Sequence, residues 1–179
     1  MRYRRARLEG GTYFFTVNLA DRRQDLLIRH IDGLRQVMRK VQVTHPFQIV
    51  AMVVLPDHLH AIWSLPLGDA DYSLRWSLIK AGFSRQLPRV ELVRESRSRK
   101  RERGVWQRRY WEHQIRDEAD LQAHVDYIHI NPVKHGHAHR AVDWPYSSVH
   151  RYVAAGLLAA DWGGESDVEG RFGEQGGAG

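Results

Sequence analysis

The amino-acid sequence predicts an α+β fold in which helices cover a mostly antiparallel sheet. Short segments rich in β-branched and aromatic residues are typical of strands, and longer segments repeat apolar residues at helical spacing. Along the chain these segments follow one another as strand, helix, strand, strand, helix, strand and a further helix. The length of 179 residues suits a single domain with a sizeable core.

One strand, one helix and two more strands are expected in the first third of the chain. Residues 10–20 (GGTYFFTVNLA) predict the first strand. A helix follows over 32–45, where Asp32 can cap the N-terminus. Its apolar residues recur at helical spacing, at Leu34, Val37, Met38 and Val41. Residues 46–66 then predict two strands joined by a tight hairpin at Pro56 and Asp57.

The middle of the chain predicts a second helix, a charged loop and a fourth strand. The helix covers 73–87, and its apolar stripe contains Leu74, Leu78 and Phe83, with Ile79 beside it. The charge run from Arg94 to Arg103 predicts an exposed loop, and contact between this loop and DNA stays open. Residues 105–115 (VWQRRYWEHQI) are strand-like, with Arg108 and Arg109 in the same stretch as Tyr110 and Trp111.

The last ordered part of the chain predicts one long and one short helix. Residues 117–132 begin with acidic side chains, which suits the positive end of the helix dipole. This helix should end near Asn131, because the residue before Pro132 disfavours helical geometry. Residues 143–158 predict a turn and a short helix. The order βαββαβ with an extra C-terminal helix is that of a ferredoxin-like sandwich.

Composition narrows the possible functions. The formal net charge is +6, with six Trp and seven Tyr, which favours a polyanion such as nucleic acid as partner over a generic basic surface. The absence of cysteine excludes disulfides, thiolate metal sites and cysteine nucleophiles. The sequence has no signal-peptide pattern and no run of about 18 apolar residues, so we expect no membrane association and a cytoplasmic location. The Gly- and Glu-rich tail at 161–179 is expected to be disordered.

A pair of histidines stands in the predicted third strand, in the stretch LPDHLHAIW. Alternate side chains of a strand point to the same face, so His58 and His60 face the same way. The residues between and after them can pack in the core: Leu59, Ala61 and Trp63. Two neutral imidazoles on a rigid strand are good metal ligands; the alternative is an exposed pair bonded to water or carboxylates. Asp57 either supports a histidine or forms the turn, and we expect the turn.

The helix over 117–132 carries an unusual polar stripe. Its apolar stripe consists of Leu121, Val125 and Ile128. A second stripe, about a quarter turn away, consists of His124, Tyr127 and Asn131. Alone, Tyr127 can be an edge residue with a hydrated hydroxyl, and Asn131 can be a helix-end residue. Combined with His58 and His60, these groups could surround one divalent cation and one phosphate.

Two segments, LPDHLHAIWSLP and VDYIHINPVKHG, resemble in order and spacing the REP-associated tyrosine transposases. These are single-tyrosine HUH transposases of the IS200-like superfamily. Four other segments match the pattern of that group as well: YRRARLEGGTYFFTV, WSLIKAGFSR, GVWQRRYWEHQIRDE and DWPYSSVHRY. The resemblance therefore runs from about Tyr3 to about Tyr152.

The resemblance implies a DNA nuclease domain over 1–160 that cleaves single-stranded DNA near palindromic, REP-type hairpins. It implies strand transfer through a 5′-phosphotyrosine intermediate, with Tyr127 as the nucleophile. His58 and His60 match the two histidines of the HUH motif, and Asn131 falls where the superfamily places a third polar metal ligand, often glutamine. The implied cofactor is a divalent metal, Mg²⁺ or Mn²⁺. The implied location is the bacterial cytoplasm, in association with the nucleoid.

Basic residues near aromatic ones suit the backbone and bases of single-stranded DNA. The residues expected to contact DNA are Arg4 and Arg5 in a basic N-terminal arm that also holds Arg7, then Lys80, Arg85, Arg108, Arg109 and Lys134. Each of them, taken singly, can also be a solvated surface charge.

Two other functions stay open at this point. One is a catalytically silent basic nucleic-acid-binding protein on the same fold, and the other is a metal hydrolase of small phosphoesters. The general base that takes the proton from Tyr127 is also open, between a metal-bound hydroxide and three histidines, His113, His124 and His129. The expected partner is a DNA hairpin with a short single-stranded tag. A monomer is expected rather than a dimer with swapped tyrosine helices.

Overall fold

The computed structural model describes residues 8–88 and 104–163. The arginines expected in the N-terminal arm, the charged loop from Arg94 to Arg103 and residues 164–179 of the expected tail lie outside the described residues. None of the helices in the described ranges is long and apolar enough to cross a membrane.

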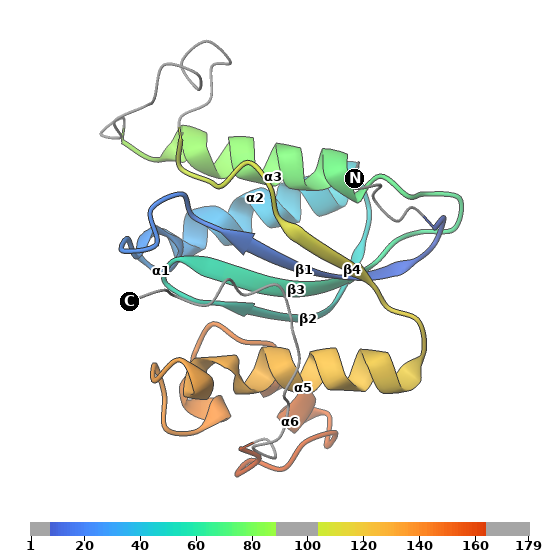
Figure 1. The fold of residues 1–179 in the computed structure, drawn as a ribbon, viewed down its shortest axis with the longest axis vertical. Coiled ribbons are helices and arrows are strands. Elements are labelled where there is room, and N and C mark those ends of the chain that lie inside the picture. Colours follow the sequence, from blue (N-terminus) through green and yellow to red (C-terminus); the bar gives the residue numbers. More distant parts are fainter. Residues whose placement is uncertain (1–7, 89–103, 164–179) are drawn as a thin grey trace, which may run out of the picture.

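The four strands form one antiparallel sheet in the order β2-β3-β1-β4 (Figure 1). They are β1 (Thr12–Asn18), β2 (Gln48–Val54), β3 (His58–Ser64) and β4 (Trp111–Gln114). The two central strands are the first and third along the chain, as the ferredoxin-like order requires, so the predicted fold class is confirmed. The turn at Pro56 and Asp57 joins β2 to β3 as expected, and the Leu55 N–H donates to the His58 carbonyl at 2.8 Å.

Helices cover both faces of the sheet (Figure 1). One face carries α2 (Ile31–Thr44) and α3 (Tyr72–Gln86). The other face carries α5 (Glu118–Lys134) and α6 (Val149–Ala154). Two short elements that the sequence did not predict are α1 (Leu26–Arg29) and the 3₁₀ turn η1 (Ala141–Asp143). The sheet therefore separates two layers, and each layer has its own core.

The larger core lies between the sheet and the α2–α3 layer. The indole rings of Trp63 and Trp76 stack in it with centroids 4.1 Å apart. The smaller core lies under α5 and contains Phe14, Ala51, Val53, Leu55, Ile62, Val125, Tyr127 and Ile128. The histidine pair of β3 faces this smaller core.

Three local predictions are wrong. Asp32 does not cap α2; His30 occupies the N-cap position and Asp32 lies in the first turn. The buried face of α3 is formed by Tyr72, Arg75, Trp76, Ile79, Phe83 and Ser84, whereas Leu74 is 41% exposed. The helix is rotated relative to the predicted orientation because its aromatic side chains bury more apolar area than leucine when they face the core. Arg108 and Arg109 precede β4 rather than lying within a strand.

The long helix does not end before its proline. α5 continues through Pro132 to Lys134, so Asn131 lies inside the helix rather than at its end. Proline has no backbone N–H, but in the last turn of a helix this costs only one hydrogen bond. The His135 N–H still donates to the Asn131 carbonyl at 3.0 Å, and the His137 N–H donates to the Pro132 carbonyl at 2.8 Å. The extra turn also places Lys134 beside the face that holds Tyr127.

The segment after α5 covers the outer edge of β2. The Val54 N–H donates to the Tyr146 carbonyl at 2.8 Å, and the Ser148 N–H donates to the Met52 carbonyl at 2.8 Å. An edge strand left open would present unpaired backbone groups to other chains. This pairing explains why the C-terminal segment folds back onto the sheet.

The rotation of α3 gives a stability prediction. Ile79→Ala should lower the free energy of unfolding by about 2–5 kcal/mol, because it leaves a cavity in the larger core. Leu74→Ala, an exposed change on the same helix, should cost less than about 0.5 kcal/mol. Urea unfolding followed by circular dichroism measures both. Equal losses in the two variants would contradict the observed orientation of α3.

Candidate functional site

The histidine pair lies on β3 and faces α5. In the sheet register His58 lies opposite Asn18, and His60 lies opposite Thr16. The two residues are 2% and 0% exposed, and their ring centroids are 5.0 Å apart. The alternative of an exposed histidine pair is therefore wrong. The intervening and following residues of β3 pack in the larger core, as predicted: Leu59, Ala61 and Trp63.

Thr16 orients the ring of His60. The Oγ1 atom of Thr16 lies 2.8 Å from Nδ1 of His60. A threonine hydroxyl can accept the Nδ1 proton, and the lone pair then resides on Nε2. The Nε2 atom is itself buried. A hydrogen bond at the far nitrogen is the usual way in which proteins fix the tautomer of a metal-ligating histidine.

Asp57 orients the ring of His58 in the same way. Its Oδ1 lies 2.7 Å from Nδ1 of His58, and Nη2 of Arg22 lies 3.2 Å from the same nitrogen. One nitrogen cannot both donate to Asp57 and accept from Arg22, and the shorter contact to a carboxylate favours the Nδ1–H form. Asp57 therefore supports the histidine as well as forming the turn, whereas the sequence favoured the turn alone.

The charges around this pair are set by burial and by Arg22. Burial lowers the pKa of His58, although the contact with Asp57 acts in the opposite direction. Partial burial raises the pKa of Asp57, but the hydrogen bonds from His58 and Arg22 outweigh it and bring that pKa to about 2. At neutral pH the imidazole is neutral and the carboxylate is ionised, which is the protonation state that a metal ligand and its partner need.

The donor set fits a divalent cation. Nε2 of His58 is buried and makes no hydrogen bond within the described part of the chain, which is costly for a polar atom unless something else binds it. Asn131 is fully buried on α5, and its amide oxygen is buried too. Two imidazoles and one amide oxygen are ligands for Mn²⁺ and, less favourably, for Mg²⁺.

Tyr127 lies against the histidine pair from the helix side. Its ring centroid is 5.2 Å from that of His60 and 6.1 Å from that of Phe14. The residue is 1% exposed, so the ring is more deeply buried than the edge position that the sequence allowed. Nζ of Lys134 stands 4.8 Å from the ring centroid. The ammonium group of Lys134 therefore makes a cation–π contact with this ring.

Several residues at the site were not predicted from the sequence. Thr16 and Asn18 share the face of β1 that bears Phe14, so the alternation of β1 could have identified both. Arg22 comes from a loop, and no sequence signal links it to Asp57. His135 follows α5, and its ring centroid lies 5.3 Å from that of His58. Only the fold brings these loop residues to the histidines.

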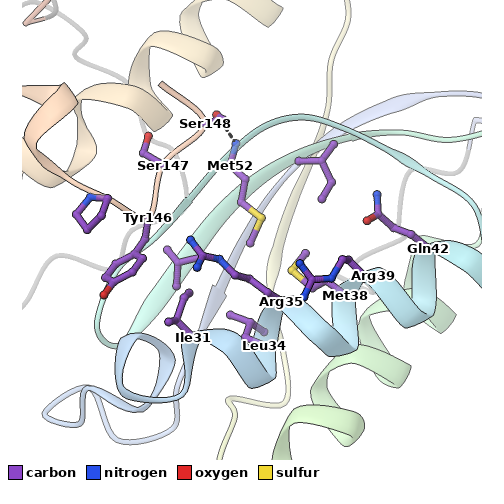
Figure 2. Close-up of a pocket in the computed structure, with 13 residues that line it drawn as sticks. Ile31, Leu34, Arg35, Met38, Arg39, Gln42, Met52, Tyr146, Ser147 and Ser148 are labelled. Carbon is purple, nitrogen blue, oxygen red and sulfur yellow. Dashed lines mark hydrogen bonds between the residues drawn. The ribbon is translucent and has the colours of Figure 1, made fainter. Parts of the chain in front are cut away.

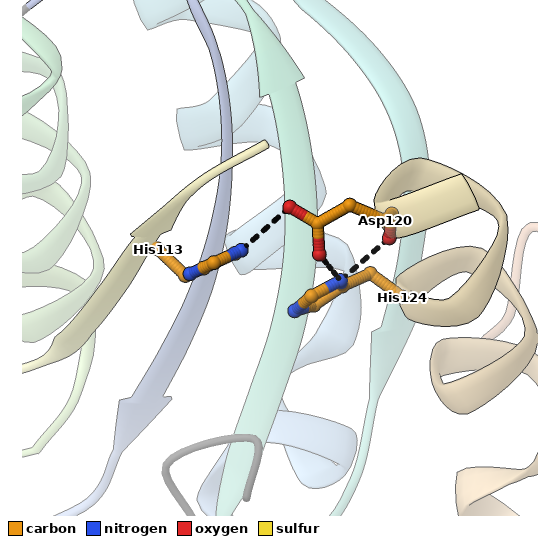
Figure 3. Close-up of side chains that lie close together, drawn as sticks. All are labelled: His113, Asp120 and His124. Carbon is orange, nitrogen blue, oxygen red and sulfur yellow. Dashed lines mark hydrogen bonds and ion pairs between the residues drawn. The ribbon is translucent and has the colours of Figure 1, made fainter. Parts of the chain in front are cut away.

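A second polar group joins β4 to α5 (Figure 3). Nε2 of His113 lies 2.9 Å from Oδ2 of Asp120, and Nδ1 of His124 lies 2.7 Å from the Asp120 carbonyl and 3.2 Å from Oδ1. Burial raises the pKa of Asp120, but hydrogen bonds from His113 and Arg116 outweigh it and bring that pKa to about 2. Burial also lowers the pKa of His124. This group could hold a metal ion, and it already links the helix to the sheet without one.

The three histidines considered as general bases have different surroundings. His113 and His124 contact Asp120, and their rings stack with centroids 4.7 Å apart. His129 is buried on α5, with its Nε2 2.8 Å from Oγ of Ser148. Burial lowers the pKa of His129 to about 4, so this residue is neutral at pH 7.

The residues expected to contact DNA lie in different places. Lys134 stands at the ring of Tyr127. Lys80 and Arg85 lie on α3, across the sheet from α5 (Figure 1), and Nζ of Lys80 donates to the Gln107 carbonyl at 2.7 Å. Arg108 and Arg109 are exposed ahead of β4. Of the basic residues expected to contact DNA that the structure describes, Lys134 thus lies beside Tyr127 and the other four lie elsewhere.

Comparison with known proteins gives close relatives over nearly the whole chain. A REP-associated tyrosine transposase of Escherichia coli K12 is 47% identical over 163 residues, which are 91% of each chain. A provisionally named REP-associated tyrosine transposase of Haemophilus influenzae is 45% identical over 168 residues, covering 93% of this chain and 96% of the relative. A solved REP-associated tyrosine transposase bound to a REP hairpin superposes with a TM-score of 0.84 and 45% identity over 98% of both chains. No protein-family model matches the chain.

The link between β4 and α5 can be tested through stability. In buffer with a chelator, Asp120→Ala should lower the free energy of unfolding by about 1–3 kcal/mol, because His113 and the Arg116 N–H lose a buried acceptor. Glu118→Ala removes an exposed carboxylate from the same helix turn and should cost less than about 1 kcal/mol. Urea unfolding provides the measurement, and similar losses for the two variants would show that the group does not fasten α5.

Proposed function

This chain belongs to the REP-associated tyrosine transposases, single-tyrosine HUH enzymes, and from that premise we propose that it cleaves single-stranded DNA beside palindromic hairpins and rejoins the ends. One observation carries the proposal. The Tyr127 ring lies 5.2 Å from the His60 ring of the buried histidine pair, which supports a nucleophile and a cation site at one place.

The proposed substrate is a hairpin with a short single-stranded tag. The solved relative binds a REP hairpin, and this chain carries a net charge of +6, which suits the same class of partner. The proposed working form is a monomer, in the bacterial cytoplasm at the nucleoid. A single chain supplies both the tyrosine and the histidines, which supports the monomer.

His58, His60 and Asn131 would hold a divalent metal, Mg²⁺ or Mn²⁺. When bound, such a cation supplies positive charge to a non-bridging oxygen of the phosphate and makes the phosphorus more electrophilic. Asp57 and Thr16 keep the two imidazoles in the tautomer that presents Nε2. Since Asn131 is fixed inside α5, the same helix would set both a metal ligand and the nucleophile.

Tyr127 would act as the nucleophile. An ordinary tyrosine has a pKa near 10, so the phenol must lose its proton as its oxygen attacks. The oxygen bonds to phosphorus, the bond from phosphorus to the 3′-oxygen breaks, and that oxygen leaves as a 3′-hydroxyl after taking up a proton. Lys134, close to the ring, would neutralise the developing charge on the phenol oxygen and the phosphate.

The covalent product would allow rejoining without an energy source. The phosphodiester energy is kept in the bond between Tyr127 and the 5′-phosphate. A 3′-hydroxyl of another strand can attack the same phosphorus, which restores the phenol and makes a new phosphodiester. The basic residues away from the tyrosine, including Arg85 and Arg108, would neutralise the DNA backbone where it leaves the site.

The nucleophile can be tested by trapping the adduct. With a labelled hairpin and Mn²⁺, the protein should form a species that survives denaturing electrophoresis. Tyr127→Phe should abolish this species while hairpin affinity changes by less than about twofold, because only the attacking oxygen is removed. Tyr110→Phe, a tyrosine whose hydroxyl contacts Ser73 on the other layer, is the matched control. An adduct in the Tyr127→Phe variant would disprove the assignment, and binding without any adduct in the parent protein would favour a silent binding protein.

The metal ligands can be tested without DNA. His58→Ala and His60→Ala should each weaken Mn²⁺ binding by more than about 100-fold, and Asp57→Ala by about 10–100-fold. Isothermal titration or electron paramagnetic resonance of Mn²⁺ measures the affinity. His139→Ala, an exposed histidine, is the control. Full affinity in both histidine variants would place the ion elsewhere, with the group around Asp120 as the next position to test.

A further inference from the structure

An open groove lies along β2, on the side of the sheet away from α5 (Figure 2). It runs between α2 and the segment 145–148 and has a volume of about 270 Å³. Its floor is apolar and is formed by Ile31, Leu34, Met38, Ile49, Met52 and Val54. This volume is close to the lower limit of about 300 Å³ for ligand pockets in proteins. The groove can therefore hold one small planar group but not a folded segment.

The rim of the groove is basic and aromatic. Arg35 and Arg39 stand one turn apart on α2 and are both exposed. The guanidinium carbon of Arg35 lies 5.7 Å from the ring centroid of Tyr146, on the opposite wall (Figure 2). Among the described residues that line the groove, none is acidic. Asp32 reaches Arg35 only at 3.6 Å and is 94% exposed, so this ion pair is weak and can open.

A row of rings connects the groove to the histidine pair. From His58 the ring centroids follow one another at 5.3 Å to His135, 6.3 Å to His137, 5.4 Å to Trp144 and 5.5 Å to Tyr146. The two histidines of the row that follow α5 are exposed, and Trp144 and Tyr146 are half-buried. Nε1 of Trp144 donates to the Val54 carbonyl at 2.9 Å, which fixes the indole at the sheet edge.

We propose that this row of rings and the groove bind the single-stranded DNA that flanks the hairpin. This inference rests on the proposed function. Unstacked bases lie on aromatic side chains whatever their sequence, and arginines neutralise the phosphates between them. The apolar floor would take one unpaired base, while Arg35 and Arg39 would contact its phosphates. A base within a duplex stays stacked and paired and cannot enter, so the site selects single strands.

The test compares three DNA molecules on one protein. The Tyr127→Phe variant serves as the background so that cleavage does not disturb binding. Fluorescence anisotropy gives the Kd for a blunt hairpin, a hairpin with a 5′ tail and a hairpin with a 3′ tail. Arg35→Gln and Arg39→Gln are each compared with Lys40→Gln, an exposed charge on the same helix outside the groove.

Arg35→Gln and Arg39→Gln should each weaken binding of at least one tailed hairpin by about tenfold. Binding of the blunt hairpin should change by less than about twofold, as should every complex of the Lys40→Gln variant. The slope of log K against log salt for that tailed hairpin should fall by about 0.7 for each phosphate that the variant no longer neutralises. Tyr146→Leu, which keeps the apolar volume but removes the ring, should also weaken the tailed complex alone.

Two outcomes overturn the inference. If the arginine variants weaken binding of the blunt and the tailed hairpins equally, or weaken binding of neither, the groove does not bind the flanking strand. The proposed nuclease function would still stand in that case. If the background protein binds none of the three molecules, the proposed function itself fails and the inference fails with it.

Discussion

The packing of α5 against β2, β3 and Phe14 of β1 is the constraint on which the site depends. This contact buries Tyr127, Asn131 and His60 together with an apolar cluster under the helix. Burial of polar groups is costly unless each finds a partner, and here Thr16 and Asp57 supply partners for the ring nitrogens that face the protein. The apolar contacts offset the remaining cost, so a strongly polar pocket can persist inside a small domain.

Two features of α5 hold it in place along its length. At its beginning, Asp120 joins the helix to β4 through His113 and stays ionised because its hydrogen bonds outweigh the effect of burial. At its end, the helix continues past Pro132, and this last turn carries Lys134 to the ring of Tyr127. A helix held at both ends keeps Tyr127 and Asn131 in a fixed position relative to the histidine pair, which the proposed in-line chemistry would require.

The C-terminal segment extends this arrangement to the edge of the sheet. It closes the open edge of β2 by backbone pairing, and in doing so it sets Trp144 and Tyr146 beside the loop that follows α5. The histidine pair and the groove along β2 thus lie on opposite sides of the sheet but are joined by one row of rings. A strand of DNA that passes the sheet edge would meet both, which gives a small domain a long binding surface.

The sequence by itself determined the order of the elements, the shared face of His58 and His60, and the polar stripe that contains Tyr127 and Asn131. These follow from local rules: the two-residue period of a strand and the 3.6-residue period of a helix. Only the tertiary structure decided the buried face of α3, the continuation of α5 through Pro132, and the partners Arg22 and His135. Aromatic packing across the sheet, a tolerated loss of one backbone bond and contacts between loops far apart in the chain depend on three-dimensional proximity, which no local period encodes.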